Sequence, residues 1–261
     1  MKAKHSVVQK ACAVLPLVLI FITVFSAKAF AEEKSPSVGL DLNLGSKYVW
    51  RGLVVTDDPV LQPSLTVGYR KLSLNFWANQ DLTDKGASGG SDITEFDYTL
   101  DYSTSVDAFS VSLGVIQYTF PNTGAEGTTE LYGVIGYDYP VAPTLSLYWD
   151  ADEAGGVYGT FSLGYSLGLP EFSGISSSLD LSGSIAYASS GWNELYYGVD
   201  DSALVDLVLT ASWSVPVDDH FSAGAYVSYS QLVDSTLRDS VNSKGSNGDP
   251  VFYGVTISFA F

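Results

Sequence analysis

The feature of this sequence that most constrains its fold is a two-residue alternation of apolar and polar side chains. Within residues 38–50 the even positions are mostly apolar or aromatic, and the odd positions are mostly polar or small. Successive side chains of a β-strand point to opposite faces, so this segment is predicted to be a strand with one apolar face. The same pattern recurs in the segments 71–80, 95–102, 157–167, 179–187, 206–215 and 221–229. No stretch after residue 31 shows convincing helical spacing, so the chain is predicted to be all-β.

The predicted strands and their connections form a regular series of about twelve strands. They are expected near residues 38–50, 60–69, 71–80, 93–102, 109–119, 129–139, 144–151, 156–167, 177–188, 203–215, 220–230 and 250–261. Every second connection is expected to be long, at 51–59, 81–92, 121–128, 152–155, 189–202 and 231–249. The intervening turns are mostly short, although 168–176 is predicted to be longer. Short periplasmic turns, long extracellular loops and an even strand number predict a closed antiparallel transmembrane β-barrel.

Two further features favour this barrel over a soluble β-sandwich, which would also alternate. Tyrosine and tryptophan gather near the ends of the apolar faces, as they do at membrane interfaces. These residues are Tyr48, Trp50, Tyr69, Tyr102, Tyr137, Tyr139, Trp149, Tyr165, Tyr187, Trp213 and Tyr229. In addition, Tyr253, Val255, Ile257, Phe259 and Phe261 alternate up to a terminal phenylalanine. This ending resembles the signal that bacterial barrel-assembly machinery recognises.

The first 31 residues have the order of a Sec signal peptide. A basic start is followed by an apolar run at 11–25 and by the small-residue triplet Ala29-Phe30-Ala31. The run contains Pro16 and is short of the roughly 20 residues that a spanning helix needs. The only cysteine, Cys12, lies at the start of this run rather than after it, which argues against a lipoprotein. We therefore expect cleavage after Ala31, export to the outer membrane and one barrel domain over 32–261.

Charge then restricts the partners of the mature chain. The sequence has 12 basic and 29 acidic residues, and four lysines but no acid fall within residues 1–31, which leaves a mature net charge of about −21. Nucleic acid is excluded as a partner because phosphate contacts need clustered lysine and arginine. The expected partners are outer-membrane lipid and lipopolysaccharide, the barrel-assembly machinery and periplasmic chaperones. The oligomeric state is left open.

The polar face of the strands is expected to line the lumen. Its charged candidates are Asp41, Lys47, Arg51, Glu95, Asp97, Asp101, Glu130, Asp138, Asp150, Asp180 and Asp206. Acids outnumber bases, so a water-filled lumen would favour cations. Alternatively, the carboxylates only pair and are solvated within the barrel wall. The connection 231–249 is the leading candidate for a plug.

The segment 44–52 (LGSKYVWRG), followed by 56–59 (TDDP) and 62–63 (QP), resembles the opening of the TorF-type porins, a family of uncharacterised proteobacterial outer-membrane proteins. A later segment, 76–79 (FWAN), is similar to the end of that family's third strand. The resemblance covers roughly the first fifth of the mature chain and implies a porin-like barrel. Arg51 is expected at the outer rim on the lumen face, where pairing with carboxylates is favoured over contact with a solute.

An enzyme is not expected, because the mature chain has one histidine, His220, in a predicted periplasmic turn. The stretch 150–155 (DADEAG) faintly resembles a calcium loop, but Ala154 and Phe161 stand where an EF-hand needs ligands, so no metal or cofactor is predicted. Two functions remain: a channel for small, preferentially cationic or neutral solutes, or a non-conducting surface barrel with structural or adhesive loops.

Overall fold

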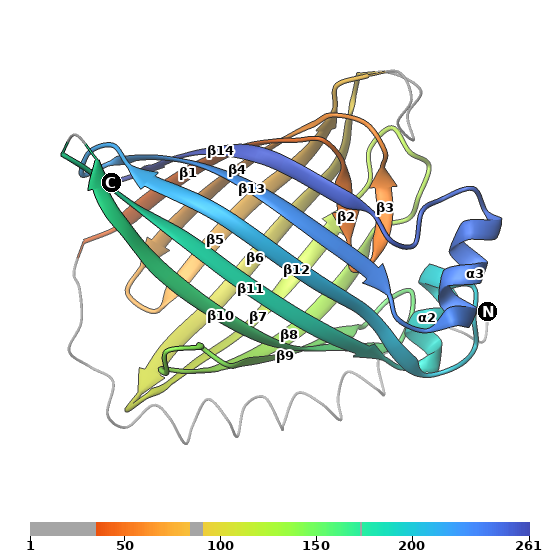
Figure 1. Ribbon diagram of the computed structural model, residues 1–261. Coiled ribbons are helices and arrows are strands. Elements are labelled where there is room, and N and C mark those ends of the chain that lie inside the picture. Colours follow the sequence, from red (N-terminus) through yellow and green to blue (C-terminus); the bar gives the residue numbers. More distant parts are fainter. Residues whose placement is uncertain (1–34, 84–90, 173) are drawn as a thin grey trace.

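In the computed structural model, which describes residues 35–83, 91–172 and 174–261, the chain forms a closed antiparallel β-barrel (Figure 1). Its wall consists of twelve strands. They are β1 (Ser37–Gly45), β4 (Val60–Tyr69), β5 (Leu72–Asp81), β6 (Ile93–Val106), β7 (Phe109–Thr119), β8 (Thr128–Tyr137), β9 (Thr144–Asp150), β10 (Val157–Phe172), β11 (Ile175–Ala188), β12 (Ala203–Pro216), β13 (Phe221–Leu232) and β14 (Val251–Ala260). The predicted closed barrel of about twelve strands is confirmed.

The barrel closes between its first and last strands. β1 pairs with β4 on one side and with β14 on the other, from Gly39 opposite Ala260 to Gly45 opposite Gly254. Each strand from β5 to β13 pairs with the strand before it and the strand after it in the chain. Closure gives each wall strand a hydrogen-bonded neighbour on both sides, so the sheet has no open edge of the kind that lipid does not tolerate.

The two ends of the barrel differ. We call the end that carries Ser37, Phe261 and the short turns the turn end, and the opposite end, formed by the long connections, the loop end (Figure 1). Several strand limits differ from expectation at the turn end. β10 and β11 continue to Phe172 and Ile175, so the long connection predicted at 168–176 is wrong. Asp138 lies beyond β8 in an exposed turn rather than within a strand.

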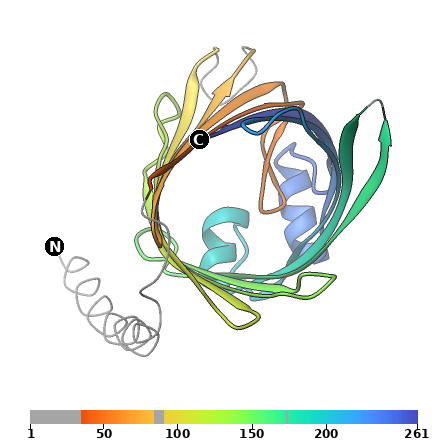
Figure 2. The same ribbon diagram turned by 90° about the vertical axis from the view of Figure 1, so that its left-hand side faces the viewer.

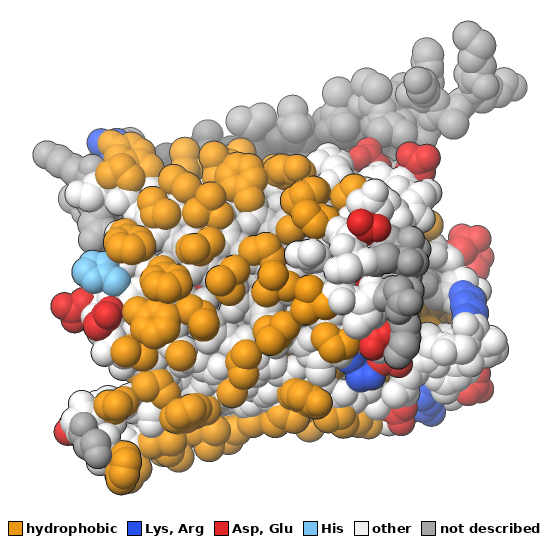
Figure 3. Space-filling view, turned by 90° about the horizontal axis from the view of Figure 1, so that it is seen from above, with side chains coloured by type: hydrophobic (Ala, Val, Ile, Leu, Met, Phe, Trp, Pro, Cys, Tyr) orange, Lys and Arg blue, Asp and Glu red, His pale blue; other side chains and the backbone are white. Residues whose placement is uncertain are grey.

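The outer surface is a broad apolar belt (Figure 3). Leucine, valine and isoleucine side chains such as Leu74, Leu147 and Ile185 point outward from the strands. Aromatic residues at the limits of the belt are also exposed, including Tyr69, Tyr187 and Trp213. The alternating residues of the predicted assembly signal lie on β14 or just after it, and four of them are exposed: Tyr253, Val255, Ile257 and Phe261. Within the described residues, no helix has the length and apolar character needed to cross a membrane.

The first predicted strand is wrong beyond Gly45. The end of that strand and part of the connection expected at 51–59 instead form a separate hairpin, β2 (Tyr48–Trp50) and β3 (Leu53–Thr56), which folds inside the ring of strands (Figure 2). Tyr48 is only 8 % exposed and packs on Trp77, with ring centroids 5.5 Å apart. Tyr48 and Trp50 therefore belong to the interior and not to the outer aromatic girdle. The alternation specified a strand but not the sheet to which it belongs.

Two short helices were not predicted. α2 (Ser190–Tyr197) and α3 (Ser235–Ser243) lie in the connections after β11 and β13, at the loop end. Asp234 caps α3 by accepting hydrogen bonds from the backbone N–H groups of Thr236 and Leu237. The expected plug segment 231–249 therefore does contribute to the interior, but it shares that position with α2 and the β2–β3 hairpin.

A buried cluster joins these three elements to the barrel wall. Trp192 and Tyr197 of α2, Leu237 and Val241 of α3, and Tyr158 of β10 pack together. Trp50 and Leu53 of the hairpin pack against this cluster. The hydrophobic core of the molecule thus lies within the barrel at its loop end.

Candidate functional site

The tip of the β2–β3 hairpin is the centre of the candidate site. Arg51 and Gly52 form its two-residue turn with φ angles of 48° and 83°. Turns with two positive φ angles match the twist of a hairpin and favour glycine. Gly52 also has no room for a side chain, because an added Cβ would lie 2.6 Å from Leu232 Cδ2. The close approach of this turn to β13 fixes the position of Arg51.

The Arg51 side chain is held by a carboxylate and by aromatic rings. Its Nη1 and Nη2 donate to Oε1 and Oε2 of Glu130 at 2.6 and 2.7 Å. The guanidinium carbon lies 4.5 Å from the ring centres of Trp50, Tyr148 and Tyr158. Arg51 therefore makes a bidentate ion pair inside an aromatic cage, a geometry suited to its planar guanidinium.

This ion pair is almost completely removed from solvent. The side chains of Arg51 and Glu130 are 9 % and 0 % exposed. Burial alone would lower the pKa of Arg51, but the hydrogen bonds and charge of Glu130 outweigh it and raise the pKa above its ordinary value. The Tyr118 hydroxyl donates a third hydrogen bond to Glu130, at Oε2, with a length of 2.9 Å. We call the β2–β3 hairpin, α2 and α3 together the plug. Arg51 is thus a permanent cation whose charge is neutralised within the plug.

Two other predicted lumen acids, Asp150 and Asp206, accept hydrogen bonds from side chains of α2 and of the barrel wall. Asp150 accepts from Thr128 at 2.8 Å and from Tyr196 of α2 at 2.9 Å. Asp206 accepts from Tyr158 at 2.7 Å. Both carboxylates are buried. They connect the barrel wall to the aromatic cluster, and neither forms an ion pair with a basic side chain in the described part of the chain.

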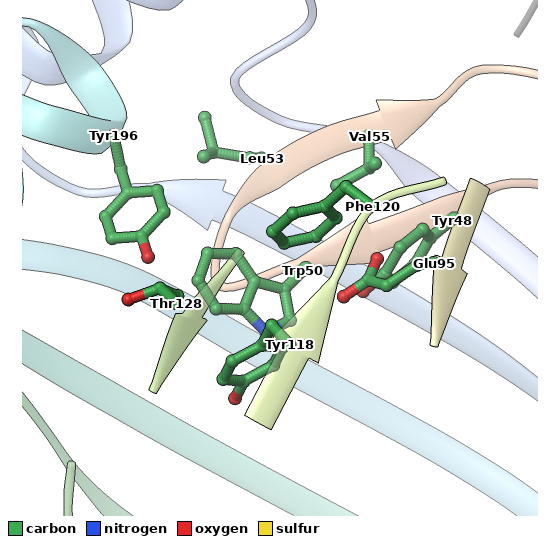
Figure 4. A pocket seen from close by; sticks show the side chains of 9 residues that line it. All are labelled: Tyr48, Trp50, Leu53, Val55, Glu95, Tyr118, Phe120, Thr128 and Tyr196. Atoms are coloured by element: carbon green, nitrogen blue, oxygen red, sulfur yellow. The ribbon is translucent and has the colours of Figure 1, made fainter. Parts of the chain in front are cut away.

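Beside the Arg51 cage lies a cavity of about 160 Å³ between the hairpin, α2 and the wall (Figure 4). Its lining is mostly aromatic and aliphatic, with the Glu95 carboxylate and Thr128 as polar members. The lining residues are Tyr48, Trp50, Leu53, Val55, Glu95, Tyr118, Phe120, Thr128 and Tyr196. Glu95 is 5 % exposed and neighbours Tyr48 and Asp97. One oxygen of Asp97, Oδ1, is buried without a hydrogen-bond partner among the described residues.

The remaining predicted charges lie elsewhere. Lys47 pairs with Asp57 near the base of the hairpin, where Asp57 is largely exposed. Asp101 accepts a 2.5 Å bond from Tyr132 and lies closer to the turn end than Asp97. Asp41 and Asp180 also face the lumen from β1 and β11, displaced toward the turn end. The predicted lumen residues therefore divide into a group around the plug and a group in the open half, with Asp138 outside both.

The turn-end half of the lumen is lined mainly by small polar side chains. A cavity of about 430 Å³ lies there against β11 to β14. Asp180, Thr210, Ser212, Ser222, Thr256 and Ser258 supply its polar lining. Such a surface can hold water, in contrast to the aromatic packing at the loop end.

Several residues of the site were not identified from the sequence. Tyr158 and Tyr196 bind lumen carboxylates, and Trp192 packs between them. The Arg51-Gly52 pair was a usable signal, because an alternating segment interrupted by such a pair can form a tight hairpin. Arg51 does bind a lumen carboxylate, but from the hairpin tip and not from the rim. His220, the histidine of the predicted periplasmic turn, is exposed at the turn end and stacks on Phe261.

Comparison with known proteins supports the fold. The chain is similar to a NanC porin structure, with 11 % identity, a TM-score of 0.53, and coverage of 84 % of this chain and 98 % of that chain. It is also similar to the KdgM porin, with 10 % identity, a TM-score of 0.51, and coverage of 85 % and 99 %. No protein-family model and no curated protein sequence matches the chain. The likeness supports a porin-type barrel, and the TorF-type family label stays a prediction.

Proposed function

We propose that this protein is an outer-membrane channel for passive passage of small, preferentially cationic or neutral solutes, with the β2–β3 hairpin as its constriction. The observation that carries the proposal is a polar lumen narrowed at one end by an inward-folded hairpin. Twelve strands enclose a wider interior than the roughly eight whose side chains fill a barrel alone. The likeness to the porin structures supports the same proposal.

The cation preference follows from which lumen charges are neutralised. Both basic candidates are paired with acids, Arg51 with Glu130 and Lys47 with Asp57. Seven predicted lumen acids form no ion pair with a basic side chain in the described part of the chain: Asp41, Glu95, Asp97, Asp101, Asp150, Asp180 and Asp206. The balance of the lumen is therefore negative, which raises the local concentration of cations in a narrow aqueous pathway.

The location and partners are part of the proposal. The apolar belt of the barrel matches a lipid environment, and the fold is the type that spans the outer membrane of Gram-negative bacteria. The proposed signal peptide, with cleavage after Ala31, lies outside the described residues. Lipopolysaccharide and outer-membrane lipid would surround the belt, and the barrel-assembly machinery would recognise the C-terminal strand.

The test is a reversal potential measured across a planar bilayer with a KCl gradient. The mature protein should conduct, and the sign should show cation selectivity. The selectivity should weaken as the salt concentration rises, because the screening length falls from roughly 10 Å at 0.1 M to roughly 3 Å at 1 M. Anion selectivity would refute the charge argument.

The second candidate is a non-conducting surface barrel. It is favoured by the tight packing at the loop end, where Trp192, Tyr197 and Leu237 are fully buried inside the barrel. Absence of conductance from folded protein, identified by a gel mobility that changes on boiling, would refute the channel and favour this alternative. Recovery as a soluble periplasmic protein would contradict both.

A further inference from the structure

We propose that the cavity beside the Arg51 cage is a binding site for small alkylammonium cations, of the kind that carry a trimethylammonium group. Five aromatic side chains line it: Tyr48, Trp50, Tyr118, Phe120 and Tyr196. They come from the hairpin, from β7 and the residue after it, and from α2. Elements far apart in the sequence thus assemble one aromatic enclosure at the loop end (Figure 4).

The first argument is the character of the acid in the cavity. Glu95 is about nineteen-twentieths buried, and its carboxylate points into the enclosure (Figure 4). Its polar neighbours are Tyr48 and the second acid Asp97, and no basic side chain among the described residues forms an ion pair with it. A buried carboxylate is costly unless a cation or hydrogen bonds compensate for it. A cationic ligand would supply that compensation.

The second argument comes from the neighbouring cage, where the protein binds a cation of its own in the same manner. The Arg51 guanidinium lies over several rings and against the carboxylate of Glu130. Trp50 borders both the Arg51 cage and the cavity. Rings with one acid are therefore an arrangement that this barrel already uses to hold a cation.

The third argument restricts the class of cation. The cavity wall also contains Leu53 and Val55, and it offers few oxygen atoms. Ca²⁺ and Mg²⁺ each take six or more oxygen ligands, so a lining of rings and aliphatic groups suits them poorly. A quaternary ammonium group carries no hydrogen-bond donors and binds through ring faces. The volume of about 160 Å³ is close to that of cavities of roughly 150 Å³ that admit benzene, so one such head group fits.

Any role of this site in solute passage rests on the channel function proposed above. Binding of the cation to the cavity does not depend on that function. The binding test uses the folded mature barrel in detergent, titrated calorimetrically with choline. The control ligand is 3,3-dimethylbutan-1-ol, which has the same shape without the charge. Choline should bind at least about tenfold more tightly than the alcohol, because the alcohol lacks the ion pair and the cation–π contacts. Equal affinities, or no binding of either ligand, would overturn the proposal.

Variants locate the binding. Glu95→Gln should weaken choline binding by at least about tenfold and leave binding of the alcohol unchanged. Phe120→Leu keeps an apolar side chain but removes one ring, so it should weaken choline several-fold, and it serves if Glu95→Gln does not fold. Asp180→Asn, in the open half of the lumen, should leave the affinity unchanged. Unchanged affinity in folded Glu95→Gln or in Phe120→Leu would overturn the assignment.

Conductance separates this proposal from the preceding one. Choline binding by a barrel that does not conduct would support the site and refute the channel. Conductance without choline binding would support the channel and refute the site. In a conducting barrel with the site, choline should reduce the potassium current of the wild type and should do so much less in Glu95→Gln.

Discussion

The two halves of the lumen are enclosed by the same strands but have opposite interiors. At the loop end the hairpin, α2 and α3 pack aromatic and aliphatic side chains around the Arg51–Glu130 pair. At the turn end small polar residues such as Thr210 and Ser258 line an open cavity. The strands alternate in the same way throughout, so the difference arises from the connections. The connections that contain the hairpin, α2 and α3 fold inward and bring their own apolar residues. The short turns leave the lumen to the side chains of the wall.

Among the variants that test this contrast, Arg51→Ala should have the largest effect. It leaves Glu130 buried without its cation, which should destabilise docking of the hairpin by about 3–5 kcal/mol. Amide hydrogen exchange over residues 46–59 should accelerate, while exchange in β12 and β13 near the turn end should stay unchanged. The matched control is Lys47→Ala, whose ion pair with Asp57 is much more exposed and contributes at most about 1 kcal/mol. Equal exchange in Arg51→Ala and the wild type would show that the ion pair does not hold the hairpin.

A smaller effect is expected from Gly52→Ala. The new Cβ would lie 2.6 Å from Leu232 Cδ2, and the alanine would have to keep the positive φ of residue 52. Together these two effects should destabilise docking of the hairpin by about 2 kcal/mol or more. The readout is again hydrogen exchange over 46–59. Gly168→Ala is the control, since no atom lies within 4 Å of its added Cβ. An equal response of the two variants would contradict a close approach of the turn to β13.

Asp234→Ala should affect only α3. It removes the acceptor for the N–H groups of Thr236 and Leu237, at a cost of roughly 1 kcal/mol to the helix. Protease cleavage within residues 233–250 should become faster, without a change over 46–59. Asp239→Ala, an exposed position of the same helix, should behave like the wild type. Faster cleavage in both variants would indicate general loosening rather than loss of a cap.

The smallest effect is expected at the turn end. Asp218 accepts from the backbone N–H groups of His220 and Phe221, and these bonds hold the pKa of its carboxyl below the usual range. The ionised carboxylate therefore stabilises the folded turn at any pH above about 3.9, the pKa of an aspartate in the unfolded chain. This stabilisation is lost as the pH falls through the lower pKa of the folded state. The His220 amide should therefore exchange faster in Asp218→Asn than in the wild type near neutral pH. The two should converge in acid, and Asp219→Asn should show no such pH-dependent difference.

The sequence predicted the barrel because alternation is local and survives in every wall strand. It failed at Tyr48 and Trp50, since alternation does not reveal whether a strand joins the wall or folds inside it. The helices were missed because eight or nine residues show too little of a helical period, and packing rather than propensity stabilises them. Asp234, an N-cap residue type, was the signal that could have located α3.

The candidate site was predictable only in part. Alternation placed Glu130, Asp150 and Asp206 on the inner face, where the structure has them. It could not show that Arg51, Tyr196 and Tyr158 would donate hydrogen bonds to these carboxylates, because those contacts depend on the tertiary fold at the loop end. It also could not show which acids stay without a basic partner. Selectivity and ligand binding therefore depend on tertiary contacts that no local pattern encodes.

The pairing of β1 with β14 has a consequence for the folding pathway. The two strands of this seam come from opposite ends of the domain, so the barrel has a seam of very high contact order that can form only after the last strand is available. Until then both edge strands expose unpaired backbone groups, which are templates for aggregation. The many acidic side chains give the unfolded chain a strong negative charge, and mutual repulsion should keep such chains apart during that interval. The seam thus makes closure a late, cooperative step whose rate depends on the C-terminal strand.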